Sequence, residues 1–243
     1  MKTHDVCFPQ ETHLSIRSLH ALRKFAQRAG CFVFGYAGSQ QSGGVAVLVR
    51  QAFLEDNFSH CTWEELVPGR LGVLRCSGER GCASFFNAHF FPTTDEARRD
   101  AIDTFRRHIR MDECVVAAGD FNFVTSLDDR LNYSLDADVR DNDRTIRAYW
   151  DEHCWDLSEV SQTTSMTYFG FDHTARLDRI YITSSLIPPQ LYRIQSSILA
   201  GYRNLSDHVP VSVGIALKTT KSSNRISNAS IMDPLFKTYV EQL

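Results

Sequence analysis

Four short clusters of polar residues stand where apolar runs begin or end, and their side chains are of the kinds that hydrolytic chemistry uses. They are Gln10-Glu11, Gly119-Asp120-Phe121-Asn122, Leu177-Asp178-Arg179 and Ser206-Asp207-His208. Apolar runs of this length predict strands, and polar residues at strand ends can all be aimed at one rim of a sheet. Carboxylates, an amide and a histidine at one rim are the groups that a metal-dependent phosphodiester hydrolase requires.

The acidic residues suggest two different tasks. Glu11 follows an apolar run, where its carboxylate could hold Mg²⁺ or Mn²⁺, because these ions favour oxygen ligands and keep waters that they share with a phosphate. Asp120 follows Gly119, a residue that permits a sharp exit from a strand. We expect Asp120 to orient or deprotonate an attacking water, and Asn122 to donate a hydrogen bond to a phosphoryl oxygen.

Two histidines complete the candidate set. His208 precedes the last apolar run, where its imidazole can act as a base or, when protonated, stabilise a phosphoryl group. Asp178 can accept a hydrogen bond from that imidazole and fix its tautomer, and His89, near the end of another apolar run, can contact a phosphate oxygen. Taken singly, each residue also has an ordinary interpretation: a solvated strand end for Glu11, a local turn for Asp120, a surface ion pair or a core histidine for the others.

The composition is that of one soluble domain with no overall attraction to nucleic acid. The 243 residues are 43% hydrophobic, enough for one substantial core, and the formal net charge is -3. Binding to a polyanion would therefore need a local patch or bound cations. The seven cysteines form no CxxC pair, Met1 to His4 lead into a strand without the apolar region of a signal peptide, and the sequence shows no membrane-length apolar run, GxSxG, HExxH or Walker motif. These features predict buried free thiols in an intracellular protein.

The elements that must position these residues are mostly strands. Helical spacing predicts a helix over 15–29 and a second helix that begins at Thr93, makes a capping box with Glu96 and includes Ile109. A third helix is expected over 145–153, after an exposed, aspartate-rich loop at 126–143. Strand patterns cover 5–10, 31–37, 44–50, 71–76, 83–90, 113–118, 177–183, 192–198 and 209–217. Helices thus interrupt a strand-built chain, which favours two packed sheets with flanking helices.

The composition changes near the C-terminal end. From Lys218 to Ala229 the chain is rich in Lys, Thr, Ser and Asn, and apolar spacing resumes after Ile231. We therefore expect one domain over 1–217, followed over 218–243 by a polar linker and the start of a helical element.

In order and spacing, the four clusters together with Asn87-Ala88-His89 resemble the endonuclease/exonuclease/phosphatase superfamily over about residues 5–217. The resemblance implies a four-layered α/β sandwich, in which two packed, mainly antiparallel sheets are flanked by helices. It also implies hydrolysis of phosphoesters with a divalent metal, Mg²⁺ or Mn²⁺. By the same resemblance, the metal ligands would be Glu11 and, in an assisting role, Asp207. The catalytic residues would be His89, Asp120, Asn122, Asp178 and His208.

Within the superfamily, residues 119–124 with 129–131, and 165–168 ahead of 176–181, resemble the endonuclease domains of non-LTR (LINE-type) retrotransposons. This resemblance implies a DNA endonuclease whose nick leaves a 3′-hydroxyl for reverse transcription, with a reverse transcriptase domain as a covalent neighbour, because residues 226–236 are similar to the segment that leads toward one. Family members begin with a strand that ends in an asparagine, whereas here Met1 lies four residues before the second expected strand. We therefore expect the first strand to be missing.

Two other interpretations stay open on the sequence. The same fold could hydrolyse a small or lipid phosphoester, since an acidic net charge does not demand DNA. The chain could also be a noncatalytic remnant, because loss of the first strand would remove an amide from the site. The chemically suitable residues at the remaining positions favour an enzyme that acts on DNA.

Overall fold

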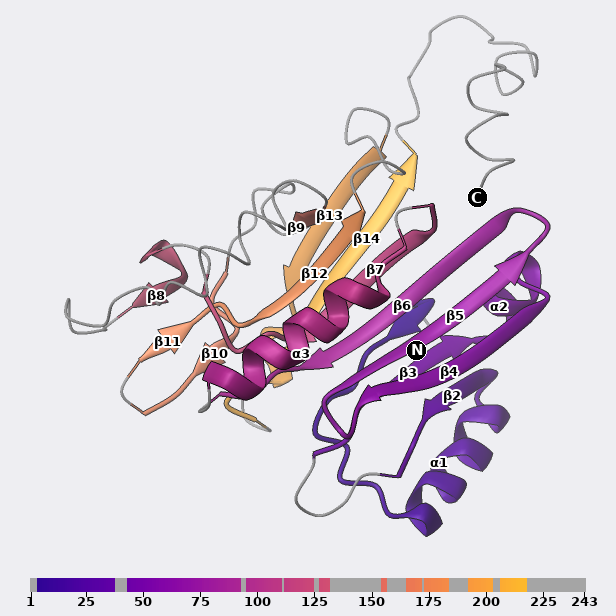
Figure 1. Cartoon of the computed structure of the whole chain (residues 1–243), viewed down its shortest axis with the longest axis horizontal. Coiled ribbons are helices and arrows are strands. Elements are labelled where there is room, and N and C mark those ends of the chain that lie inside the picture. The colour runs from indigo at the N-terminus through magenta and orange to yellow at the C-terminus, as the bar shows by residue number, and fades with distance from the viewer. Residues whose placement is uncertain are drawn as a thin grey trace, which may run out of the picture.

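The computed structural model describes ten segments of the chain, which form the helices and strands drawn in Figure 1. The segments are 4–37, 43–92, 95–110, 112–124, 127–131, 154–156, 165–171, 173–183, 192–202 and 206–217. No helix in these segments is both long and apolar enough to cross a lipid bilayer. The helix expected over 145–153 and the segment 218–243 lie outside the described residues.

A six-stranded sheet forms the centre of the described structure, with the strand order β4-β5-β6-β7-β12-β9. Its strands are β4 (His60–Val67), β5 (Leu71–Gly78), β6 (Gly81–His89), β7 (Cys114–Asp120), β12 (Asp178–Thr183) and β9 (Cys154–Asp156). β6 and β7 are parallel, whereas the other neighbours in this sheet are antiparallel. The helix α3 (Asp95–His108) joins β6 to β7, because parallel neighbours need such a crossover connection.

Two smaller sheets pack on one face of the large sheet. They are β1 (Val6–Cys7), β3 (Ala46–Arg50) and β2 (Cys31–Gly35), in the order β1-β3-β2, and the pair β13 (Tyr192–Ile198) and β14 (Val211–Leu217). Val49 of β3 belongs to one apolar cluster with Leu74 and Phe85 of the large sheet. Ile194 of β13 packs against Ile182 of β12. The two smaller sheets therefore form a second layer on the same face.

The two long helices cover the outer faces of these layers (Figure 1). α1 (Ile16–Arg28) buries Leu19 and Ala26 against β2 and β3. α3 packs on the large sheet, where the rings of Phe105 and Phe86 meet edge to face with centroids 4.8 Å apart. The layers are therefore α1, the smaller sheets, the large sheet and α3. This arrangement confirms the four-layered α/β sandwich with mainly antiparallel sheets.

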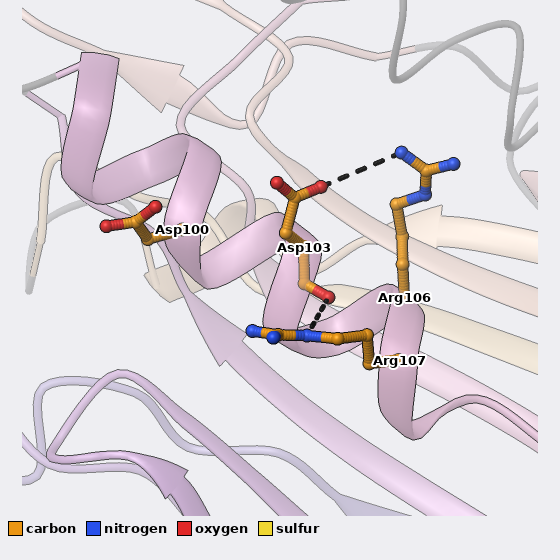
Figure 2. Close-up of a pocket in the computed structure, with 4 residues that line it drawn as sticks. All are labelled: Asp100, Asp103, Arg106 and Arg107. Carbon is orange, nitrogen blue, oxygen red and sulfur yellow. Dashed lines mark hydrogen bonds and ion pairs between the residues drawn. The ribbon is translucent and has the colours of Figure 1, made fainter.

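The face of α3 that is turned away from the sheet is polar. Figure 2 shows the side chains of Asp100, Asp103, Arg106 and Arg107, which line a pocket on this helix. Asp103 Oδ1 lies 3.7 Å from Arg106 Nη1, and Arg107 Nε donates to the Asp103 carbonyl oxygen at 3.2 Å. Contacts between residues three and four apart are typical of a solvated helix face.

The predicted strands and the first two predicted helices are present within the described residues, with ends displaced by a few positions. Thr93 of the capping box lies outside these residues. Several elements were not predicted: the helix α2 (Gln51–Asn57), the strands β4 and β9 of the large sheet, and two short strands near residues 130 and 174. β4 was missed because the alternation of Cys61 and Trp63 with polar residues is short and is interrupted by Glu64 and Glu65. Pairing with β5 stabilises this edge strand.

The beginning of the predicted exposed loop instead takes part in a buried ion cluster. After a short 3₁₀ helix (Leu127–Asp129), β8 (Arg130–Leu131) pairs with β11 (Thr174–Ala175), and β11 pairs with β10 (Tyr168–Phe169). The Asp129 carboxylate accepts hydrogen bonds from Arg176 Nε at 2.7 Å and Arg179 Nη2 at 2.8 Å, and all three side chains are buried.

The prediction of an exposed loop was therefore wrong for Asp129, because its partners lie about fifty residues further along the chain. Burial opposes ionisation of this carboxyl group, but the charges of Arg179 and Arg176 outweigh burial and hold the pKa of Asp129 below its ordinary value.

Replacing Asp129 with Asn should lower the free energy of unfolding by about 3 to 5 kcal/mol, because the substitution leaves buried guanidinium charge uncompensated. Urea unfolding followed by circular dichroism measures the change. The pKa of Asp129 is lower in the folded chain than its unfolded value, so this contribution is present above about pH 4 and is lost as the pH falls further. The matched control is Asp128→Asn at the exposed neighbour, for which we expect about 0.5 kcal/mol or less. Equal losses in the two variants would contradict the structural role of Asp129.

Candidate active site

Three neighbouring strands of the large sheet bring three predicted site residues to the same edge. β6 ends at His89, β7 ends at Asp120 and β12 begins at Asp178. The register pairs His89 with Asp120 and Asp120 with Asp178. Residues paired on adjacent strands project to the same face, and the strands are about 4.8 Å apart. The three side chains therefore stand in a row across the edge.

Gly119 and Asn122 shape the backbone on either side of Asp120. Gly119 has a φ of +142°, and a Cβ atom there would lie 1.9 Å from the Ala88 carbonyl oxygen, so no larger residue fits. Asn122, with a φ of +52°, donates its backbone N–H to Asp120 Oδ1 at 2.9 Å. Its side-chain Nδ2 donates to Asp120 Oδ2 and to the Phe90 carbonyl oxygen, each at 2.8 Å. We expected Asn122 to donate to a phosphoryl oxygen, but here both amide hydrogens are committed within the protein, and Asn122 orients Asp120.

The surroundings of Asp120 favour the protonated carboxyl group. Its side chain is buried, and burial, followed by the negative charge of Asp178, raises the pKa of Asp120 to about 7 against the opposing effects of His208 and the Asn122 N–H. A carboxyl group with a pKa near 7 can exchange a proton with a bound water at neutral pH.

His208 contacts two of the three residues in the row. Its Nδ1 lies 2.8 Å from Asp178 Oδ2, and its Nε2 lies 3.9 Å from Asp120 Oδ2. Burial disfavours the charged imidazole, but the hydrogen bond and charge of Asp178, with the charges of Asp120 and Asp207, outweigh it and raise the pKa of His208 to about 9. At neutral pH His208 is therefore a cation that donates Nδ1–H to Asp178 and turns Nε2–H toward Asp120. The ring of Tyr168 packs beside the imidazole, with centroids 5.1 Å apart.

Thr167 connects the backbones that carry this ion pair. Its Oγ1 accepts the N–H of Asp178 at 3.0 Å, and its carbonyl oxygen accepts the N–H of Val209 at 2.7 Å. Because Val209 follows His208 directly, one buried residue fixes the backbone next to both members of the pair. The hydrogen bond between Asp178 and His208 therefore depends on Thr167.

Glu11 reaches the same edge from the segment that follows β1. Gln10 Nε2 donates to Asn87 Oδ1 at 2.7 Å, and Asn87 Nδ2 donates to the Pro9 carbonyl oxygen at 2.8 Å. Asn87 is buried in β6, two residues before His89, so these bonds attach the segment to the strand. Glu11 has a φ of +48°, and its Oε1 lies 3.5 Å from His89 Nε2, while 65% of its side chain is exposed. Its carboxylate thus lies at the solvent side of the buried row.

His89 is buried beside a positive charge. Arg70 Nη1 lies 3.0 Å from Nδ1 and 3.2 Å from Nε2 of the imidazole, and the Arg70 carbonyl oxygen accepts the His89 N–H at 2.7 Å. Burial, followed by the charges of Arg70, His208 and His13, lowers the pKa of His89 to about 4, so the ring is neutral at pH 7. The guanidinium also lies 4.9 Å from the ring centroid of Phe91, a cation–π contact.

The structure places Asp207 at the margin of the site. Its side chain is exposed and accepts a hydrogen bond from Ser206 Oγ at 3.3 Å. Among the described residues, no hydrogen bond or ion pair joins Asp207 to Glu11 or Asp120. Asp207 acts on the cluster through its charge, which contributes to the raised pKa of His208.

The carboxylates of the site have the chemistry of ligands for a hard divalent cation. Within the described residues, no three His, Cys, Asp or Glu side chains converge as a preformed metal site. The carboxylates of Glu11 and Asp207 are both open to solvent, and Glu11 Oε1 lies at the edge of the row, 3.5 Å from His89 Nε2. Mg²⁺ is commonly held by one or two carboxylates, with water and substrate phosphate completing its shell. The donor set therefore fits such an ion.

Two contributors to the site were not predicted as functional residues. Arg70 lies in the turn between β4 and β5, and Thr167 precedes β10. Neither stands in a cluster of titratable residues, so only the pairing of distant strands brings them to His89 and Asp178. Thr167 lies in the segment 165–168, which resembles a motif of retrotransposon endonuclease domains, so the sequence did contain a signal for this residue. The motif does not indicate that the Thr167 hydroxyl accepts the backbone N–H groups of Leu177 and Asp178.

An α/β sandwich with a row of carboxylates and histidines at one sheet edge has the groups that hydrolysis of phosphoester bonds requires. The family model described as "Endonuclease/Exonuclease/phosphatase family" matches residues 1–208, and the chain belongs to this family. Enzymes of the family generally depend on a divalent metal. A search of the curated proteins found no match.

Solved structures support the same fold. An AP endonuclease from Archaeoglobus fulgidus matches with a TM-score of 0.65 and 16% identity, over 90% of each chain. The AP endonuclease LMAP from Leishmania major also has a TM-score of 0.65, with 15% identity over 88% of this chain and 79% of that one. The 3′ phosphatase NExo from Neisseria, bound to a product DNA hairpin, has a TM-score of 0.62 with 15% identity over 87% and 89%. At these identities the likeness shows the fold alone.

Replacing Asp178 with Asn should lower the pKa of His208 from about 9 toward its ordinary value, because the substitution removes the charge that accepts Nδ1–H. NMR titration of the His208 ring protons measures the shift. The raised pKa means that the pair stabilises the fold fully below about pH 6.5 and loses this effect as the pH rises through about 9. Asp207→Asn is the control, with a smaller decrease because Asp207 does not hydrogen-bond to the ring. A His208 pKa that is unchanged in Asp178→Asn would refute the assigned contact.

Proposed function

We propose that this protein is a divalent-metal-dependent phosphodiesterase, most specifically an endonuclease that nicks DNA and leaves a 3′-hydroxyl. The observation that carries the proposal is the row His89, Asp120 and Asp178 with His208 beside it, because the row combines a carboxyl group of pKa about 7 with an imidazolium. A base that accepts the proton of the attacking water and a cation that faces the phosphoryl oxygens are what hydrolysis by an activated water requires.

In this proposal Asp120 accepts the proton of the attacking water. Its carboxylate is fixed by the two hydrogen bonds from Asn122, so the accepting oxygen has a defined direction. His208, held by Asp178, directs its Nε2–H at the phosphoryl oxygens as negative charge develops. The catalytic set is therefore Asp120 and His208, with Asn122 and Asp178 in positioning roles.

The metal would be held by Glu11, with Asp207 in an assisting position. When bound, Mg²⁺ or Mn²⁺ would supply positive charge to the phosphate and the leaving oxygen. Glu11 is suited to this role because its carboxylate is exposed, while the Gln10–Asn87 pair fixes the backbone that carries it. Asp207 is exposed next to His208 and adds negative charge to the same edge.

Two groups at the His89 end of the row, the imidazole of His89 and the guanidinium of Arg70, suit a phosphate next to the one that is cleaved. His89 is neutral and buried, and the guanidinium of Arg70 lies against it. A guanidinium fork binds phosphate oxygens strongly, and a neutral imidazole can donate or accept beside it. This local cation offsets the net charge of -3 where DNA would bind.

DNA is the favoured substrate class because similar structures have been determined as AP endonucleases and as a 3′ phosphatase with product DNA. The motif resemblance further supports a LINE-type endonuclease within the family, with a reverse transcriptase as its covalent neighbour and an intracellular site of action. The stretches that carry this resemblance include Asp129, Arg176 and Arg179, which form the buried ion cluster.

Purified protein should nick supercoiled plasmid in Mg²⁺ and lose this activity in EDTA. His208→Ala and Glu11→Gln should each reduce the nicking rate at least about 100-fold, because the first removes the cation and the second a metal ligand. Conversion of supercoiled to open-circular DNA on agarose gels measures the rate, and extension of the nick by a DNA polymerase tests for the 3′-hydroxyl.

The matched control is Glu79→Gln, an exposed carboxylate in the turn between β5 and β6, which should nick at the parent rate. Nicking that survives both site substitutions would contradict the proposal. Metal-dependent turnover of small or lipid phosphoesters without nicking would instead favour that substrate class, and a folded protein without either activity would favour a noncatalytic remnant.

Replacing Arg70 with Ala should lower kcat/KM for nicking by about 10- to 100-fold, because a charge-assisted hydrogen bond contributes about 1.5 to 3 kcal/mol. Arg70→Lys should retain part of the activity, since it keeps the charge but loses the fork. Arg80→Ala, in the turn at the opposite end of β5, removes an equal charge from an exposed position and should leave the rate unchanged. Equal losses in Arg70→Ala and Arg80→Ala would point to nonspecific electrostatics rather than to a phosphate contact.

A further inference from the structure

Two cysteines face each other in the middle of the hairpin formed by β4 and β5. The register pairs Cys61 directly with Cys76, so both side chains project to the same face of the sheet. Their Sγ atoms approach to 2.7 Å, compared with about 2.05 Å in a disulfide. Both residues are free thiols in the structure. Little movement separates this contact from a covalent bond.

The other cysteines whose side chains the structure describes are not placed for such a bond. Cys7 in β1 and Cys31 in β2 lie on either side of β3, and β6 lies between Cys114 in β7 and Cys76 in β5. The Cys7–Cys31 pair and the Cys76–Cys114 pair are therefore each two strand spacings of about 4.8 Å apart. Cα atoms more than about 7 Å apart cannot be bridged without backbone movement. Cys82 is paired with Ser77, next to Cys76 in β5, and therefore points to the opposite face.

The two thiols also differ in a way that suits stepwise oxidation. Cys61 is partly exposed, whereas Cys76 is buried. Contact with Cys76 lowers the pKa of Cys61 despite the opposing effect of burial, and contact with Cys61, followed by burial, raises the pKa of Cys76. Cys61 is therefore the more accessible and the more readily ionised of the two, as the first thiol to react must be.

We infer that Cys61 and Cys76 form a redox modification site, at which a peroxide converts the pair of thiols into a disulfide that links β4 to β5. The Cys61 thiolate attacks one oxygen of hydrogen peroxide, the O–O bond breaks, and Cys61 becomes a sulfenic acid while hydroxide leaves. The Cys76 sulfur then attacks the Cys61 sulfur and displaces the hydroxyl group. Two thiols and one peroxide yield one disulfide and two waters, so the cysteines are oxidised and the peroxide is reduced.

The bond would fasten the hairpin whose turn carries Arg70. β4 is at the edge of the sheet, with β5 as its strand partner, so a covalent link resists separation of the two strands where the sheet has least support. A disulfide also restricts the unfolded chain, which adds to the resistance against unfolding. This inference concerns the thiols alone and does not depend on the proposed nuclease activity.

The experiment treats the folded, full-length chain with hydrogen peroxide, blocks the remaining thiols with an alkylating reagent in denaturant, and locates modified cysteines by peptide mass spectrometry. The expected product is a linked peptide that contains Cys61 and Cys76 and disappears on reduction with dithiothreitol. Oxidised protein should unfold at a higher urea concentration than reduced protein. Neither effect should occur in Cys61→Ser, whereas both should persist in Cys82→Ser, which removes an exposed thiol outside the pair.

Two controls keep the result specific to the folded structure. Cys76→Ala provides a second test of the pair, with circular dichroism to verify that each variant folds. The same oxidation carried out in urea should give a mixture of links, because unfolded thiols have no fixed partner. The inference would be overturned if folded protein retained alkylated Cys61 and Cys76 after peroxide, if Cys61 were oxidised to a sulfinic acid without a link, or if folded and unfolded chains gave the same mixture.

Discussion

The site depends on the alignment of three strand ends, and one close approach sets that alignment. β6 and β7 are parallel, and at Gly119 the backbone of β7 comes so near the Ala88 carbonyl oxygen that a Cβ atom would lie 1.9 Å from it. With Gly119 in place, Asp120 stands opposite both His89 and Asp178. A slip of one residue would turn the Asp120 side chain to the other face of the sheet. The positions of these three side chains are thus fixed by the packing of the backbone and do not depend on the charges of the side chains.

Within this frame, two histidines acquire opposite protonation states. Both are desolvated, which disfavours the cation. His208 has a carboxylate at 2.8 Å and stays protonated, whereas His89 has the Arg70 guanidinium beside it and is neutral. Asp120 lies within 3.9 Å of both rings and is itself near half-protonation at neutral pH. The site therefore contains a protonated His208, a neutral His89 and an Asp120 carboxyl group that can exchange protons. The two histidines differ because one has a carboxylate and the other a guanidinium as its neighbour.

The sequence was sufficient to predict most strands, the layered architecture and the residues of the row, because these depend on local patterns. Alternation and apolar runs mark the strands, and Asp120, Asp178 and His208 occur where those runs start or end. The partners of Asp129 could not be predicted, since they lie about fifty residues away and charged residues in a polar stretch normally remain solvated. Asn122 was expected at a phosphoryl oxygen because the sequence does not show that its side-chain amide donates to Asp120 and to the carbonyl oxygen of Phe90, which follows β6.

The β4–β5 hairpin shows how a segment without catalytic residues can decide the geometry of the site. Gly72 leaves room for the Trp63 ring, since a Cβ atom there would lie 2.3 Å from that ring, so the ring packs diagonally across β5 in the observed register. Glu65 of β4 accepts the Gly69 N–H of the turn at 2.8 Å, which fixes the residue before Arg70. The guanidinium can therefore lie against His89 without a catalytic motif of its own. β4 has β5 as its strand partner in the sheet. The packing of Trp63, or a bond between the facing cysteines, would therefore hold the two strands together. The same contact would keep Arg70, in the turn between them, in the position proposed for phosphate binding.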